Sequence, residues 1–205
     1  MRPTSLLAGL LVAGCGSRGD PALRGRFTDR FDRAEIGPNW RDTSGQWRVS
    51  DGAVCVEGAR NHPLWLRRRL PHDVRIELRA RSASPDGDIK VEVFGDGRSY
   101  ATEDSYTATS YVLVFGGWRN RLSAIARMDE HGTDRKTRTA PRVEPDRAYR
   151  FRIERRGRRL EWRIDGAPFL EMDDPAPLAG EGHDHFAFND WDAPVCFDDL
   201  EVTPL

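Results

Sequence analysis

Apolar and charged residues alternate through much of this chain. In residues 74–82 (VRIELRARS) and 149–154 (YRFRIE), apolar side chains alternate with Arg and Glu, and the same period appears at 89–94 (IKVEVF) and 160–164 (LEWRI). Successive side chains of a strand point to opposite faces, so a period of two in this many segments predicts half-buried antiparallel strands. The charged positions are then expected to form a solvated lattice of Arg and Glu that pair across strands.

Turn signals separate these runs, and no segment shows a capped helical stripe. Asp-Gly pairs occur at 51–52 and 165–166, and similar turn residues occur at 84–88 (SPDGD), 95–97 (GDG) and 154–159 (ERRGRR). Such residues between alternating runs are signals for hairpins and turns. Strands at this spacing predict an all-β fold, a two-sheet antiparallel jelly-roll sandwich.

The N-terminus has the features of a bacterial export signal. Arg2 precedes an apolar run at 5–14 (SLLAGLLVAG) that is too short to span a bilayer stably as a mature helix. Residues 11–15 (LVAGC) resemble the lipobox of bacterial lipoproteins, in which the cysteine is acylated and becomes the new N-terminus. We therefore expect a signal peptide at 1–15, lipidation at Cys15 and attachment to the bacterial cell envelope. Gly16 favours the outer membrane, and an ordinary signal peptide with an accidental cysteine is the alternative.

A tether and one domain are expected after this signal. Residues 16–26 are rich in Gly, Pro and polar residues, which predicts a flexible tether, and residues 27–205 suit a single domain. The net charge of -1 argues against a nucleic-acid partner, because such proteins need a basic excess to displace counterions. Lysine occurs only as Lys90 and Lys136, and we attribute the preference for arginine to genome composition.

The remaining cysteines suggest a disulfide. If Cys15 carries lipid, Cys55 and Cys196 are left as a pair in an exported protein, where disulfides form and persist. They lie in strand-like runs at 53–58 (AVCVEG) and 194–202 (PVCFDDLEV). We expect a bridge between them, and two separate buried thiols are the alternative.

Three stretches resemble concanavalin A-like (lectin/glucanase) jelly-roll domains. Residues 27–58 carry an F-x-D-x-F start and then G-x-W-x-V-x-D-G, and residues 149–174 carry a strand, a hairpin and x-W-x-I-D-G. Residues 195–202 (VCFDDLEV) resemble the closing strand of the same superfamily. The most similar subgroup is that of bacterial domains of the 3-keto-disaccharide hydrolase type. The resemblance implies the fold rather than the function, because the superfamily includes lectins, hydrolases, lyases and adhesion modules.

The resemblance also implies a ligand site on one sheet or on the loops at its rim. Three stretches of the sequence combine aromatic with polar residues and are candidates for such a site. A flat tryptophan can stack on a sugar while polar side chains contact its hydroxyls. We therefore expect a site for a carbohydrate or glycoconjugate built from Trp118, Arg119, Asn120, Arg127, Glu130, His131, His183, His185, Asn189, Asp190 and Trp191. The alternative is that the two tryptophans pack the rim of the sandwich.

The catalytic motifs of related jelly-roll enzymes are missing from the sequence. Hydrolysis of glycosides usually needs two carboxylates about 5–10 Å apart, and the E-x-D-x-x-E string of jelly-roll glucanases does not occur. Asp129 and Glu130 would point to opposite faces of a strand. Residues 75–79 (RIELR) resemble one motif of jelly-roll alginate lyases, but its companion motifs are missing. We therefore expect a non-catalytic binding protein. A structural envelope lipoprotein without a small ligand, or a glycan-processing hydrolase or lyase, is the alternative.

No cofactor is expected. His183 and His185 would share one face of a strand, but no third metal ligand is identifiable. Asp29 with Asp198 is a candidate for calcium, because the resemblance implies such a site where the terminal strands meet. We favour the alternative, in which these aspartates cap turns and accept hydrogen bonds from backbone amides.

Overall fold

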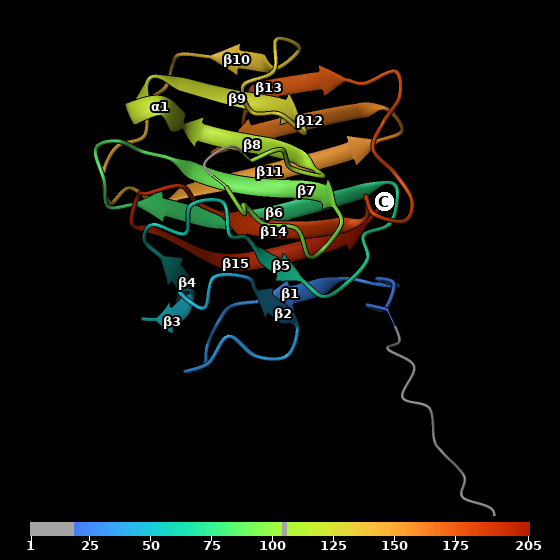
Figure 1. Ribbon diagram of the computed structural model, residues 1–205, viewed down its shortest axis with the longest axis horizontal. Coiled ribbons are helices and arrows are strands. Elements are labelled where there is room, and N and C mark those ends of the chain that lie inside the picture. Colours follow the sequence, from blue (N-terminus) through green and yellow to red (C-terminus); the bar gives the residue numbers. More distant parts are fainter. Residues whose placement is uncertain (1–18, 104–105) are drawn as a thin grey trace, which may run out of the picture.

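The computed structural model describes residues 19–103 and 106–205, which fold into two antiparallel sheets packed face to face (Figure 1). This confirms the predicted two-sheet sandwich. Cys15 and the predicted signal peptide lie outside the described residues. The one helical element of the described chain is the four-residue turn α1 (Gly117–Asn120), and no described helix has the length and apolarity needed to cross a bilayer.

The eight-stranded sheet has the order β13-β12-β11-β6-β15-β4-β3, and β1 pairs with β15. Its outer face is the predicted charged lattice, in which Arg75 lies 3.0 Å from Glu154 and Arg152 lies 3.3 Å from Glu77. The strands are β1 (Phe27–Asp29), β3 (Arg48–Ser50), β4 (Ala53–Val56), β6 (Val74–Ser82), β11 (Tyr149–Arg156), β12 (Arg159–Ile164), β13 (Ala167–Asp173) and β15 (Val195–Pro204).

The seven-stranded sheet has the order β10-β9-β8-β7-β14-β5-β2. Its strands are β2 (Trp40–Asp42), β5 (Leu64–Leu66), β7 (Ile89–Gly95), β8 (Tyr111–Gly116), β9 (Leu122–Arg127), β10 (Lys136–Arg138) and β14 (His185–Asn189). Its outer face departs from the prediction, because Lys90 and Glu92 of β7 are only 2% and 0% exposed. Loops fold over these two side chains, so they do not belong to a solvated lattice.

The core lies between the sheets and fixes the end of β8. Phe115 packs edge-on against Tyr149, Phe151, Trp162 and Phe169, with ring centroids 4.9–6.5 Å apart. Such T-shaped pairs add a favourable quadrupole interaction to the burial of apolar area. Phe115, near the end of β8 and close to turn α1, is therefore held in place by side chains of the opposite sheet.

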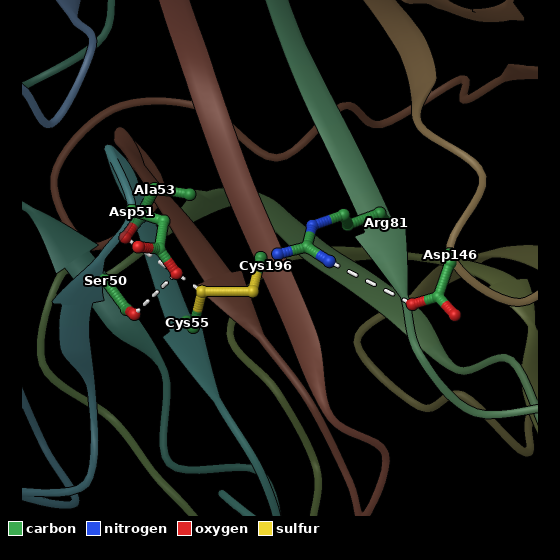
Figure 2. The surroundings of a disulfide bond; sticks show 7 residues. All are labelled: Ser50, Asp51, Ala53, Cys55, Arg81, Asp146 and Cys196. Atoms are coloured by element: carbon green, nitrogen blue, oxygen red, sulfur yellow. Dashed lines mark hydrogen bonds and ion pairs between the residues drawn. A yellow bond between two sulfur atoms is a disulfide. The ribbon is translucent and has the colours of Figure 1, made fainter.

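The disulfide prediction is confirmed. Cys55 of β4 and Cys196 of β15 are register partners, and their sulfur atoms are bonded with Cα atoms 4.1 Å apart (Figure 2). The bridge joins residues separated by 141 positions in the sequence. It therefore links the early strands of the eight-stranded sheet to its last strand.

Part of the predicted tether lies against the sandwich. The backbone N–H of Leu23 donates to the carbonyl of Arg69, and the N–H of Arg69 donates to the carbonyl of Pro21. The carboxylate of Asp20 lies 3.2 Å from Arg41 and 3.3 Å from Arg67. Residues of the predicted tether thus contact the sandwich. The predicted domain begins only at residue 27.

Candidate functional site

A groove of about 820 Å³ opens on the outer face of the seven-stranded sheet. Lys90 of β7 and Val114 of β8 contribute to its floor, and turn α1 contributes Trp118 and Arg119. Loop residues at 129–131 and 191–193 also line it. The groove therefore brings together segments that are far apart in the sequence.

Turn α1 has an unusual backbone conformation. Trp118, Arg119 and Asn120 have φ angles of 52°, 59° and 57°, in the left-handed region that residues with a Cβ rarely adopt. Asn120 holds the turn, because its Nδ2 donates to the carbonyls of Val143 (2.7 Å) and Pro85 (3.0 Å). Its Oδ1 accepts from the N–H of Val143 at 2.9 Å. The predicted binding residues Trp118, Arg119 and Asn120 thus form a tight turn, and the first two line the groove.

We expect Asn120→Ala to lower the free energy of unfolding by about 2–3 kcal/mol, because it leaves buried backbone groups of Val143 without partners. Urea unfolding measures this loss. Arg119→Ala is the matched control, since Arg119 is exposed and has the same left-handed backbone. The account of the turn is wrong if the two variants lose equal stability.

Lys90 is the buried cation of the groove floor. Its Nζ lies 2.9 Å from Glu130 Oε2 and donates to Asn61 Oδ1 at 2.9 Å. Burial lowers the pKa of Lys90, but the carboxylates of Glu130 and Asp88 outweigh burial, and the net shift is upward. The ammonium group therefore stays charged at neutral pH.

Two aspartates beside Lys90 have raised pKa values. Asp88 is partly buried, its Oδ2 accepts the N–H of Trp191 at 3.0 Å, and burial raises its pKa. Asp190 is buried and accepts the N–H groups of Ala59 and Ala193, and burial, together with the charge of Asp88, raises its pKa to about 8. With this pKa, Asp190 can gain or lose a proton near neutral pH.

The groove contains five of the predicted ligand-binding residues: Trp118, Arg119, Glu130, His131 and Trp191. The Trp118 ring meets the ring of His131 edge-on at 5.7 Å, and Arg135 lies over its face at 5.0 Å. Trp191 is 37% exposed. Neither tryptophan belongs to the buried core, so both rings are accessible from the groove.

The other six predicted residues do not line the groove. Arg127 contacts Asp174 at 3.0 Å, His183 bonds the carbonyl of Thr109 at 2.7 Å, and His185 lies 2.7 Å from Asp184. The remaining three are the buried side chains of Asn120, Asn189 and Asp190. All six side chains contact other protein groups, and among them Asn120 holds turn α1, which lines the groove.

Sequence reasoning missed several groove residues, among them Asn61, Asp88, Lys90 and Tyr106. One signal was available, because Lys90 is one of only two lysines in an arginine-rich chain. Asn61 and Tyr106 come from irregular loops, and no local pattern places such loops over a sheet.

The calcium candidates are engaged with protein groups. Both oxygens of Asp29 accept from Arg33, at 2.6 and 2.8 Å, and Oδ2 also accepts from Trp40 Nε1 at 2.8 Å. The side chain of Asp198 accepts the N–H of Asp199 at 2.6 Å. Within residues 19–103 and 106–205, no group of three or more His, Cys, Asp or Glu side chains is placed to hold a metal ion.

The fold and the groove are those of a jelly-roll domain. Comparison with known protein families identifies the family to which the domain belongs. Residues 27–203 match the model of the 3-keto-alpha-glucoside-1,2-lyase-like domain. The chain belongs to this family, which confirms the resemblance to concanavalin A-like domains of the 3-keto-disaccharide hydrolase type. No curated protein sequence matches the chain.

Several solved structures share the fold. A Bacillus subtilis protein of unknown function with a galectin-like fold has a TM-score of 0.66 at 12% identity, covering 87% of this chain and 94% of its own. The carbohydrate recognition domain of Emp47p has a TM-score of 0.63 at 10% identity, with coverages of 87% and 94%. A glycosidic hydrolase has a TM-score of 0.62 at 11% identity, with coverages of 90% and 97%. At these identities the likeness shows the fold alone.

Proposed function

We propose that the protein binds a 3-keto-α-glucoside in the groove and cleaves its glycosidic bond by elimination. The observation that carries this proposal is the meeting of Asp88, Lys90, Trp118 and Trp191 in one groove of a domain of this family. The sugar-binding and hydrolase names of two structural neighbours support a carbohydrate as the ligand. The tryptophan rings are suited to the apolar faces of sugar rings.

The reaction needs a base and a group that stabilises negative charge. A ketone at C3 of the sugar makes the hydrogen on C2 acidic. A base removes that proton, negative charge develops on the ketone oxygen, and a C1=C2 double bond forms as the C1–O bond breaks. Stabilising the developing oxyanion with a fixed positive charge is often the largest single contribution to such catalysis.

Asp88 and Lys90 fit these two roles. Asp88 lines the groove, and the raised pKa of its carboxyl makes it a stronger base than an ordinary aspartate. Lys90 lines the groove, remains charged and has little freedom to move. We assign Asp88 as the base and Lys90 as the oxyanion stabiliser.

Binding without catalysis is the second candidate, and one observation favours it. Lys90 is already paired with Glu130 and Asn61, so its charge is partly balanced before any ligand arrives. A groove whose ionic groups balance one another can bind sugar hydroxyls without reacting with them.

Titration with a 3-keto-α-glucoside, with product analysis in the same samples, separates these candidates. We expect Asp88→Asn to lower kcat by about 100-fold or more while binding persists. Asp86→Asn is the matched control, since Asp86 also lines the groove but is exposed.

Trp118→Ala and Trp191→Ala are expected to weaken binding about tenfold, the scale of lost aromatic contacts. Binding without product favours the binding protein, and no binding favours a structural role.

The proposed location is the bacterial cell envelope, with a lipid anchor at Cys15 and the outer membrane as the target. The support is the lipobox-like sequence at 11–15. The disulfide is consistent with export, because such bonds persist in oxidising compartments.

A further inference from the structure

A second pair of ionisable groups lies under the groove and has no role in the steps above. Glu92 follows Lys90 by two positions on the same face of β7 and is completely buried. The loop before β8 covers it, and Tyr106 of this loop packs on a small apolar cluster of Ala108, Val112 and Val114. A carboxyl in such a position is tolerated only when hydrogen-bond donors surround it.

Three donors surround Glu92. Ser110 Oγ lies 2.6 Å from Oε2, Asn189 Nδ2 lies 2.7 Å from Oε1, and the Tyr106 hydroxyl lies 3.3 Å from both oxygens. None of the ion pairs within the described residues includes this carboxyl. Burial raises the pKa of Glu92 to about 7, so the group exists as both acid and carboxylate at neutral pH.

Tyr106 connects this buried carboxyl to the groove. Its side chain lines the groove while its hydroxyl contacts Glu92, which is not itself among the lining residues. A phenol has one proton and two lone pairs, so it can accept a proton from one neighbour while it gives its own to another. Burial and the charge of Glu92 raise the pKa of Tyr106, which keeps it a neutral phenol.

The charged neighbours of this pair are few. Lys90, on the same strand, lowers the pKa of Glu92 but does not overcome burial. Asp96 and Glu130, from the two loops beside Tyr106, raise the pKa of the phenol. The surroundings therefore keep Tyr106 a neutral phenol, and burial leaves Glu92 partly protonated near pH 7.

We infer that Tyr106 is the general acid of the elimination and that Glu92 is the positioning residue that supplies its proton. This inference rests on the function proposed above. As the C1–O bond breaks, the leaving oxygen takes the Tyr106 proton and the Glu92 acid passes its own proton to the Tyr106 oxygen. Glu92 becomes a carboxylate, and the proton removed from C2 by Asp88 is released to solvent, from which Glu92 is reprotonated.

Two substrates with different leaving groups test this relay. Methyl 3-keto-α-glucoside must release methanol and needs a proton donor, whereas the 4-nitrophenyl analogue releases a stable phenolate without one. We expect Tyr106→Phe and Glu92→Gln to lower kcat on the methyl substrate by about 100-fold, but on the nitrophenyl substrate by less than about threefold. In the wild type, kcat on the methyl substrate alone should fall as pH rises through about 7, where Glu92 ionises.

The variants separate a proton relay from a structural role. Glu92→Gln keeps the shape of the side chain and can still donate and accept hydrogen bonds, but it cannot give up a proton. Tyr111→Phe is the control, because it removes a buried hydroxyl that bonds Asp174 outside the groove. Equal losses on both substrates, or no loss on the methyl substrate, overturn the relay and leave the elimination standing. Failure of the wild type to cleave either substrate overturns both.

Discussion

Lys90→Met should lower the free energy of unfolding by about 3–5 kcal/mol at pH 8, because removing one partner leaves buried carboxylates without a cation. Glu130 loses the ammonium group at 2.9 Å, and Asp88 loses the positive charge that lowers its pKa. Urea unfolding measures the difference. The deficit should shrink at pH 5, since Glu92 and Asp190, with pKa values of about 7 and about 8, are then protonated and uncharged.

The sign of this pH effect follows from the folded-state pKa values. A carboxyl with a raised pKa binds its proton more tightly in the folded protein, so stability falls as pH rises from the unfolded-state pKa to the folded-state one. Removing Lys90 raises these folded-state pKa values further and steepens that fall. Lys136→Met is the control, because Lys136 is exposed on β10 and should change stability by less than about 0.5 kcal/mol. Equal effects of the two variants, or a deficit independent of pH, would contradict the assignment of Lys90 as a buried paired cation.

Reducing the disulfide between Cys55 and Cys196 should lower the free energy of unfolding by about 4–5 kcal/mol, because the bond closes a long loop in the unfolded chain. The bond joins residues 141 positions apart, so its removal gives the unfolded state much more conformational freedom. Urea unfolding with and without a reducing agent measures the loss.

The double variant Cys55→Ser with Cys196→Ser supplies the control for reduction. Its stability should match that of the reduced wild type and should not respond to the reducing agent. If reduction leaves the wild type unchanged while the sulfurs are shown to be free, the bond does not constrain the unfolded state as described.

The sheets could be predicted because their pattern is local. Strands β6, β11 and β12 alternate apolar and charged residues, and their charged sides do face solvent. The alternation in β7 is the same, yet Lys90 and Glu92 are buried. Alternation reports which residues share a face, but it does not report whether a distant loop covers that face.

The groove could be predicted only in part for the same reason. The two tryptophans that line it are conspicuous in the sequence, and both were predicted as binding residues. Tyr106 and Asn61 reach the groove through loops whose paths depend on contacts with other segments, such as the bond from the N–H of Asn61 to the carbonyl of Asp190. The proposed acid–base groups meet only in the folded protein and form no motif in the sequence, so the sequence alone favoured a non-catalytic protein.

The most direct test of the proposed function is the identity of the product. The wild-type protein, incubated with methyl 3-keto-α-glucoside in H₂¹⁸O, would be followed by proton NMR and mass spectrometry. Elimination predicts a new vinylic C1–H signal, loss of the C2–H signal and no ¹⁸O in the released methanol or, initially, in the sugar. Unchanged substrate, or direct formation of a free 3-keto sugar with ¹⁸O at C1 and C2–H intact, would contradict the proposal.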